Sequence, residues 1–217
     1  MTELEIMQQR HSVRQYADMP IEQDKRTVLN ELAEKLNADA GVHIQIIYDE
    51  PKCFDSFMAH YGKFSGVKNY IALVGKKSPS LDEALGYCGE QLVLKAQELG
   101  LNTCWVAMTH GKSAAKVESG EKLVCLIALG YGEVQGVEHK SKPMNELCVC
   151  PEPMPEWFKA GMDAALLAPT AMNQQKFKFE LLPDGSVKAS CGTGFYTKLD
   201  LGIVRYHFEA ASKKKTV

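Results

Sequence analysis

One stretch near the end of the chain, Ala168-Pro169-Thr170-Ala171-Met172-Asn173-Gln174-Gln175-Lys176-Phe177, lies between a helical pattern and a strand pattern. Its proline ends the helical run, because the ring removes a backbone donor and clashes with the preceding turn. Behind the proline come three amide side chains, each of which offers donors and an acceptor side by side. Such amides suit a flat heterocycle whose edge alternates donors and acceptors, so we interpret this stretch as a candidate ligand-binding loop.

The composition of the chain is that of an ordinary globular protein, with 217 residues, 45% hydrophobic and 24% charged. This length fits one large domain or two small fused lobes. A formal net charge of −2 argues against bulk nucleic-acid binding, which relies on many Lys and Arg contacts to phosphate. No apolar run reaches the roughly 20 residues that span a bilayer, and the acidic N-terminus is unlike a signal peptide. We therefore expect a cytoplasmic protein that binds neither membranes nor nucleic acid.

Seven cysteines are scattered among apolar neighbours, which is typical of reduced, buried thiols in a cytoplasmic protein. The pair in Cys148-Val149-Cys150, with His139 nearby, is the one candidate for a metal site. The C-x-C spacing is not the usual zinc pattern, and the sequence offers no convincing fourth ligand. We expect no metal.

Hydrophobic periodicity predicts helices that alternate with strands throughout the chain. The expected helices cover residues 3–9, 22–36, 52–61, 81–99, 113–118, 156–168 and 198–212. The expected strands cover residues 42–48, 70–75, 103–107, 122–132, 176–182 and 186–191. This alternation favours an α+β fold with a mixed sheet.

Two basic segments of the chain are candidates for binding an anion. Arg10-His11-Ser12-Val13-Arg14 places two guanidiniums and a hydroxyl within five residues, and guanidinium planes bind phosphate through two parallel hydrogen bonds. Lys140-Ser141-Lys142 comes after the strand that ends in Gly130-Tyr131-Gly132. Each segment alone is typical of a solvated surface. A binding role is indicated only by the order in which these segments and the other motifs occur along the chain.

The order of these motifs resembles the nitroreductase and flavin reductase family. Members carry an R-x-S-x-R segment, a helix leading into G-L-G-T-C-W, an A-L-G-Y strand and a basic K-x-[KR] segment. The corresponding residues here are 10–14, 100–105, 128–131 and 140–142, and residues 168–177 are similar to the family's A-P-S-x-x-N-x-Q-P-W element. The resemblance implies a nitroreductase-like, mainly antiparallel sheet flanked by helices, with FMN as cofactor and NADH or NADPH as reductant.

The resemblance also implies three groups of site residues. The implied ligands of the FMN phosphate and ribityl chain are Arg10, His11, Ser12, Arg14, Lys140 and Lys142. The implied contacts to the isoalloxazine ring are Pro169, Thr170, Ala171 and Asn173. The loop implied to lie near flavin N5, where the family offers a backbone N–H, consists of Ala107, Met108 and Thr109. No protein nucleophile is needed, because the flavin carries the hydride.

The position of the Pro-Asn element departs from the family, in which it stands near the start of the chain. Residues 37–41 occupy that place here, whereas residues 156–212 repeat a helix–motif–strand unit and then give Asp200-Leu201-Gly202-Ile203, similar to the family's D-x-G-I helix. We therefore expect a nitroreductase-like lobe at 1–145, a connector at 146–155 and a shortened second lobe at 156–212. Such a chain would act as a monomeric pseudo-dimer.

The implied function is FMN-dependent reduction, by NAD(P)H, of nitroaromatics, quinones or a similar flat electron acceptor. One alternative is a flavin-binding carrier or sensor without turnover. A second alternative is a protein that has this fold but does not bind FMN, because its substituted loops no longer close the site. Ala107-Met108 stands where the family usually has Gly-Gly, and Lys176-Phe177 stands where it usually has Pro-Trp. The aromatic residues that precede the 70–75 strand are either a packed core edge or a cover over the flavin, namely Phe54, Phe57, Tyr61, Phe64 and Tyr70.

Overall fold

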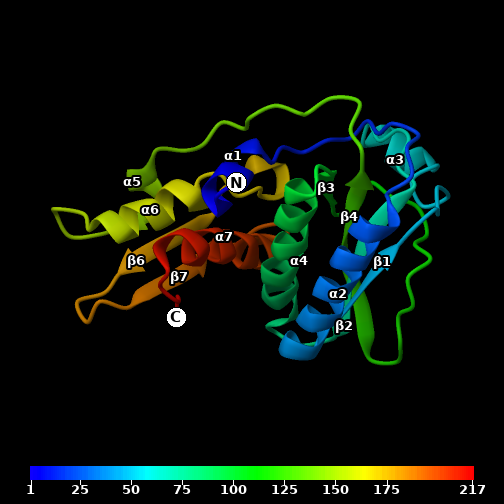
Figure 1. Cartoon of the computed structure of the whole chain (residues 1–217). Coiled ribbons are helices and arrows are strands. Elements are labelled where there is room, and N and C mark those ends of the chain that lie inside the picture. Colours follow the sequence, from blue (N-terminus) through cyan, green and yellow to red (C-terminus); the bar gives the residue numbers. More distant parts are fainter. The chain divides into compact units, whose positions relative to one another are not determined.

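The computed structural model describes all residues from 1 to 217, and its contacts divide them into two compact units. The four-stranded unit contains residues 10–81 and 91–138, and the three-stranded unit contains residues 1–9, 82–90 and 139–217. Figure 1 labels the helices and strands of both. Helix α4 (Leu81–Glu98) contributes its first half to the three-stranded unit and its second half to the other.

The four-stranded unit has an antiparallel sheet in the order β1-β2-β4-β3. Its other elements along the chain are α2 (Gln23–Ala40), β1 (His43–Ile47), α3 (Phe57–Tyr61), β2 (Asn69–Lys76), β3 (Asn102–Val106) and β4 (Glu121–Gly130). The two central strands, β2 and β4, are apolar runs and are buried over most of their length, as expected for strands covered on both faces. Helix α2 packs along β1 (Figure 1), where the Asn37 side chain exchanges two hydrogen bonds with the Ile44 backbone.

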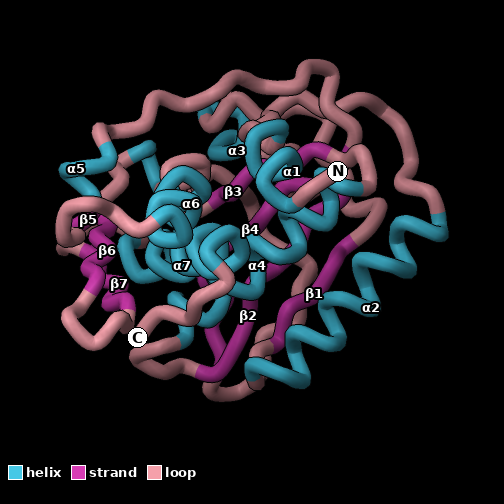
Figure 2. Tube along the Cα trace, turned by 60° about the vertical axis from the view of Figure 1, so that its left-hand side comes forward, coloured by secondary structure: helices cyan, strands magenta, loops and turns pink.

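The three-stranded unit combines a small sheet with a pair of packed helices. Its other elements are α1 (Glu3–Gln9), α5 (Met144–Leu147), β5 (Cys148–Val149), α6 (Glu156–Ala165), the 3₁₀ turn η1 (Ala171–Asn173), β6 (Phe177–Leu181), β7 (Val187–Cys191) and α7 (Thr197–Ser212). Strand β6 pairs in parallel with β5 and antiparallel with β7. Figures 1 and 2 show α6 beside α7, and the Phe208 ring stacks on Phe179 at 4.5 Å and meets Phe158 edge-on at 5.4 Å.

Two glycines let α7 approach the first half of α4 at backbone distance. A Cβ added to Gly202 would lie 2.0 Å from the Glu83 carbonyl oxygen, and one added to Gly86 would lie 2.1 Å from the Leu199 carbonyl oxygen. Real Cβ atoms do not come so close, so any side chain here would force the two helices apart. Gly202 is the glycine of the D-x-G-I motif, and in the structure it allows the close packing of α7 on α4.

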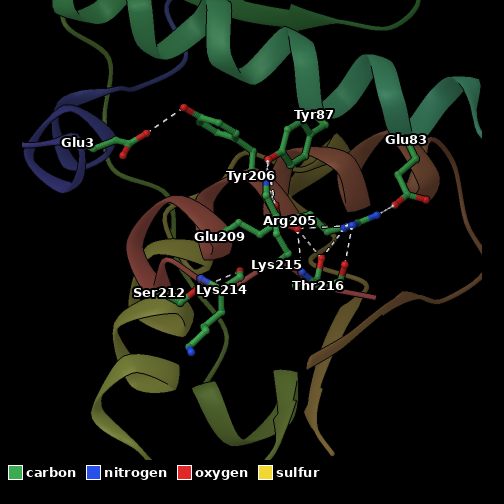
Figure 3. A network of polar contacts seen from close by, with 10 residues as sticks. All are labelled: Glu3, Glu83, Tyr87, Arg205, Tyr206, Glu209, Ser212, Lys214, Lys215 and Thr216. Atoms are coloured by element: carbon green, nitrogen blue, oxygen red, sulfur yellow. Dashed lines mark hydrogen bonds and ion pairs between the residues drawn. The ribbon is translucent and has the colours of Figure 1, made fainter. Parts of the chain in front are cut away.

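Glu209, near the end of α7, holds the segment Lys213–Val217 onto the three-stranded unit (Figure 3). One carboxylate oxygen accepts hydrogen bonds from the Thr216 backbone N–H (3.0 Å) and hydroxyl (2.7 Å), and the other accepts from Lys215 and Tyr87. The Val217 N–H then donates to the Val187 carbonyl, and the Ala189 N–H to the Val217 carbonyl. The segment thus pairs with the edge of β7, which would otherwise present unpaired backbone groups.

The structure confirms the α+β class and the mainly antiparallel pairing, and it corrects two helices. The helix expected at 113–118 is wrong, because this stretch is non-helical. Its N–H groups bond to side chains instead, Ala114 to the Tyr70 hydroxyl and Lys116 to the Gln45 side chain, each at 2.9 Å. The helix expected at 52–61 begins only at Phe57, where the Ser56 hydroxyl accepts a capping bond from the Ala59 N–H.

None of the helices combines the length and the apolar character that crossing a bilayer requires. All seven cysteines are free thiols, five of them buried. No group of three or more His, Cys, Asp or Glu side chains is arranged to hold a metal ion. His139, the proposed neighbour of Cys148 and Cys150, has a ring nitrogen 2.9 Å from the Leu166 carbonyl oxygen.

Candidate functional site

The segment Pro169–Gln175, named here the Pro-Asn loop, has an unusual backbone. Three of its non-glycine residues lie in the left-handed region, Met172 and Asn173 each with φ 52° and Gln175 with φ 46°. Only Asn tolerates this region well, so the loop stores strain. Strain of this kind persists where the surroundings over-determine the conformation, and it gathers at ligand sites. The loop that the sequence predicts to bind a ligand is thus also a strained part of the backbone.

The first anchor of the loop is Asp200, in the first turn of α7. Its carboxylate accepts hydrogen bonds from the Ala171 N–H at 2.9 Å and from the Gln174 side-chain amide at 2.8 Å. The side chain is buried, and burial raises the pKa of Asp200 to about 6, although these two hydrogen bonds act to lower it. A buried carboxyl group thus accepts both of these hydrogen bonds from the loop.

The second anchor is the basic segment around Lys140 and Lys142. The Asn173 and Gln175 side-chain amides both donate to the Lys140 carbonyl oxygen at 2.9 Å. In return the Gln175 side chain accepts from the Lys142 backbone N–H at 2.7 Å, and the Lys142 ammonium donates to the Gln174 carbonyl at 3.0 Å. Two groups of predicted site residues that are far apart in sequence therefore lie together within the three-stranded unit.

The Asn173 amide is exposed and is only half used by these contacts. One amide hydrogen goes to Lys140, and its oxygen accepts one bond from the Gln175 amide at 2.9 Å. One hydrogen and one oxygen lone pair remain, since a primary amide has two of each. A donor beside an acceptor is what the edge of a flavin ring requires, so the residue fits its predicted role. Pro169, Thr170 and Ala171 lie half-buried beside it, with the Thr170 hydroxyl accepting from the Gln175 N–H.

In the four-stranded unit, the predicted phosphate ligands gather at the start of β3. Ser12 forms a bridge with Thr103, and the Val13 N–H donates to the Thr103 carbonyl at 3.0 Å. Burial raises the pKa of the Cys104 thiol, while the guanidiniums of Arg14 and Arg10 and a hydrogen bond with Ser12 act to lower it. Ser12 therefore contacts this thiol, and both guanidiniums are close enough for their charges to act on it. Two guanidiniums and a hydroxyl in one place form a donor set that fits a phosphate.

Tyr16 is a residue of this cluster that sequence reasoning missed. Its side chain is buried, and its hydroxyl has no hydrogen-bond partner. Burial raises the pKa of this phenol well above its usual value, with Cys104 acting in the same direction and Arg14 against it. Buried hydroxyls without a partner are rare, and this one lies among the residues that are predicted to take a polar ligand. The sequence shows Tyr16 only as an aromatic residue two positions after Arg14, and this pattern does not indicate that its hydroxyl is buried and unpaired.

The loop predicted to lie at flavin N5 follows the other end of β3. Met108 is 60% exposed, and Thr109 packs against Gly62 at the end of α3. Thr103 and Ala107 are four residues apart along an extended strand, which corresponds to roughly 13 Å. The predicted phosphate ligand Ser12 thus lies beside Thr103 near the start of the edge strand β3, and the loop predicted to lie near flavin N5 follows the last strand residue, Val106.

The aromatic residues near α3 were interpreted either as a packed core edge or as a cover over the flavin, and the structure divides them into two groups. Phe54, Phe64 and Tyr70 are buried and in ring contact at 5.3 and 5.7 Å, so for them the core interpretation is confirmed. Phe57 and Tyr61 are 83% and 75% exposed, so for them it is wrong. A cavity of about 190 Å³ in this region is lined by Pro51, Phe54, Asp55, His60 and Lys68, among others, and by none of the predicted site residues.

Each unit carries part of the predicted set. The four-stranded unit contains Arg10, His11, Ser12, Arg14, Ala107, Met108 and Thr109, and the three-stranded unit contains Lys140, Lys142, Pro169, Thr170, Ala171 and Asn173. The sequence marked Gln174 and Gln175 only as amides that suit a heterocycle, and Asp200 only as part of the D-x-G-I motif. In the structure these three side chains anchor the Pro-Asn loop. Their roles depend on long-range pairing, which a local pattern does not contain.

Comparison with known proteins places this architecture. The family model described as "Putative TM nitroreductase" matches residues 3–212. A structure described as a "putative nitroreductase" from Thermotoga maritima has a TM-score of 0.72 at 21% identity, over 99% of this chain and 87% of that chain. No match was found among curated proteins.

Two further solved structures are similar over part of the chain. A "putative nitroreductase in complex with FMN" from Desulfovibrio desulfuricans has a TM-score of 0.56 at 20% identity, over 70% of this chain and 98% of that chain. A "putative NADH dehydrogenase/NAD(P)H nitroreductase" from Parabacteroides distasonis has a TM-score of 0.52 at 19% identity, over 67% of this chain and 95% of that chain. At these identities the similarity shows the fold, and it is the fold that the motif order implied.

Proposed function

Because the chain belongs to the TM nitroreductase family, whose members are oxidoreductases, we propose that it is an FMN-dependent oxidoreductase. NADH or NADPH is the proposed reductant, and a nitroaromatic, a quinone or a similar flat electrophile is the proposed acceptor. The observation that carries the proposal is the arrangement along β3, with Ser12 paired with Thr103 near the start of the strand, Arg10 and Arg14 close enough to act on the Cys104 thiol, and the loop from Ala107 to Thr109 after the last strand residue. The relative described in complex with FMN and the relative described as an NAD(P)H nitroreductase support the choice of cofactor and reductant.

The residues of this chain bind and orient the cofactor in the proposed mechanism. Arg10 and Arg14 neutralise the phosphate, Ser12 adds a neutral hydrogen bond with His11 alongside, and Lys140 and Lys142 add positive charge. The Asn173 amide hydrogen-bonds the ring edge, with Pro169, Thr170 and Ala171 in contact with the ring. FMN, when bound, supplies the hydride chemistry, and the protein supplies position and electrostatics. The buried Cys104 thiol has a raised pKa, which argues against a nucleophilic role.

The test is a titration of the purified apoprotein with FMN, followed by an oxidation assay of NADH and NADPH with a quinone or nitroaromatic acceptor. We expect one FMN per chain and nicotinamide oxidation that depends on FMN and on the acceptor. Stoichiometric binding without oxidation would favour the carrier or sensor. Absence of FMN binding would favour the alternative in which the fold is kept without cofactor.

A further inference from the structure

The buried carboxylate of Asp200 lies against the strained part of the Pro-Asn loop. It is 4% exposed, and each of its two oxygens accepts one hydrogen bond from the loop, from the Ala171 N–H and from the Gln174 side-chain amide. These contacts flank Met172 and Asn173, the residues with left-handed backbone. We propose that Asp200 is a positioning residue that holds the Pro-Asn loop in its binding conformation and makes FMN affinity depend on its ionisation. The inference rests on the proposed FMN function.

The hydrogen-bond pattern requires a group that accepts on both sides. The Gln174 amide donates to Asp200 at 2.8 Å and to the Phe195 carbonyl at 2.7 Å, so both of its hydrogens are used. An Asn at position 200 could accept from the Ala171 N–H but would then present its own NH₂ to the Gln174 NH₂. Turning the Gln174 amide over would relieve that conflict and place its oxygen against the Phe195 carbonyl. An ionised carboxylate satisfies all these groups together, whereas an amide at this position does not.

The pH dependence of the free energy of unfolding distinguishes two possible roles of Asp200, holding the loop and stabilising the fold. Burial raises the pKa of Asp200 from the usual 3.8 to about 6, so the folded state binds a proton more tightly than the unfolded state. The free energy of unfolding therefore falls as the pH rises from about 4 to about 6. The ionised form weakens the fold at neutral pH, and a residue that served stability alone would do better as a neutral one.

No charged side chain competes with the loop for Asp200. Burial and the two loop groups account for its pKa shift, without a contribution from another charge. Three charged groups on the neighbouring elements are engaged with other partners. Glu83 pairs with Arg205, Lys142 donates to loop carbonyl oxygens, and Lys176 donates to the Thr193 carbonyl. Protonation of Asp200 therefore turns one of the two accepting oxygens into a hydroxyl, which accepts more weakly, and this weakening is not compensated by another ion.

The experiment compares the wild type with Asp200→Asn, Gln174→Leu and a matched control, Asp163→Asn, which removes an exposed carboxylate from the same unit. Hydrogen exchange of the apoprotein at pH 7.5 reports the peptide that contains residues 168–176. FMN dissociation constants are then measured between pH 5 and pH 8. The ratio between variant and wild type cancels the protonation of the FMN phosphate itself, which affects all variants alike.

We expect exchange in this peptide to be about tenfold faster in Asp200→Asn, and FMN binding at pH 7.5 about tenfold weaker, the scale of one charged hydrogen bond. The affinity ratio should approach one at pH 5, where the wild-type carboxyl is neutral. Gln174→Leu should loosen the same peptide without removing Asp200, and Asp163→Asn should behave as the wild type.

Unchanged exchange in both loop variants, or an affinity ratio that is constant from pH 5 to pH 8, would overturn the inference. Faster exchange spread evenly over the whole protein would assign Asp200 to general stability and would also overturn it. Failure of the wild type to bind FMN would refute the proposed function instead, while the exchange of the apoprotein would still decide whether Asp200 holds the loop.

Discussion

Replacement of Glu209 by Ala should destabilise the protein by about 3 kcal/mol. The substitution leaves two donors of Thr216, its N–H and its hydroxyl, without their acceptor, and Thr216 is only 7% exposed. A buried donor left unsatisfied costs about 1–3 kcal/mol, so the two together cost about 2–4 kcal/mol. Lys215 adds little, because its side chain is 80% exposed and can return to water. The expected loss is large relative to a typical point substitution.

Urea unfolding at pH 7 measures this loss, with Glu209→Gln and Glu146→Ala for comparison. The Gln variant keeps one accepting oxygen for Thr216, so its loss should be about 1 kcal/mol. Glu146 is exposed in α5, and its removal should change the free energy of unfolding by less than about 0.5 kcal/mol. A loss below about 1 kcal/mol in Glu209→Ala would refute the reasoning, since it would mean that Glu209 does not hold the Lys213–Val217 segment.

The pH dependence offers a second check on the same residue. Burial acts to raise the pKa of Glu209, but hydrogen bonds from Lys215, Thr216 and Tyr87 outweigh it and hold this pKa below the usual 4.5. A lowered pKa in the folded state gives stability that is present above the unfolded pKa and is lost as the pH falls through the folded one. The difference between wild type and Glu209→Ala should therefore be full above about pH 4.5 and shrink in more acidic solution.

Four further predictions concern packing, cofactor binding and assembly. Gly202→Ala should lower the free energy of unfolding by about 2 kcal/mol through overpacking, whereas Gly192→Ala, whose new Cβ would meet nothing closer than 3.9 Å, should change it little; equal effects in urea unfolding would contradict the close helix contact. Arg14→Ala should weaken FMN binding by about 10- to 150-fold, the scale of a charged hydrogen bond, and an unchanged fluorescence titration would count against the phosphate cluster. Asn173→Leu should lower FMN affinity or shift the flavin potential, and normal values of both would remove Asn173 from the site. Light scattering of the FMN-bound protein over a dilution series should show a monomer with one FMN per chain, and flavin release that tracks dissociation of a dimer would disprove the single-chain pseudo-dimer.

The element pattern was predictable where one periodicity dominated. Strands β2 and β4 are apolar runs, and α4 has a clear helical spacing and a following glycine, so their positions follow from sequence. The 113–118 segment was not predictable, because its N–H groups are satisfied by Tyr70 and Gln45, which lie far away in sequence. Helix α2 likewise continues to Ala40, four residues beyond Leu36, where the predicted helix ended, and Gly41 caps it.

The sequence predicted which motifs belong to the candidate site, but it did not predict the contacts between their side chains. The motif order led to the family and to the loop around Asn173. It did not predict that the Asn173 amide bonds to Lys140, nor that Asp200 lies against the same loop. Tyr16 was missed because an unpaired buried hydroxyl is visible only once its surroundings are known. The roles of the predicted ligands, the lobe boundaries and the pseudo-dimer remain predictions.

The three-stranded unit is discontinuous in sequence, and this has a consequence for any attempt to cut the chain into pieces. Residues 1–9 and 82–90 belong with 139–217, and the Tyr206 hydroxyl bonds to Glu3 while Arg205 pairs with Glu83. A protease that cuts the chain near residue 138, at the boundary of the two units, would break one peptide bond and leave these contacts intact. The two fragments should therefore elute together from a sizing column and separate only in denaturant. Residues 139–217 expressed alone would lack the helices that cover α7, and they would expose the glycine-lined face of that helix to water.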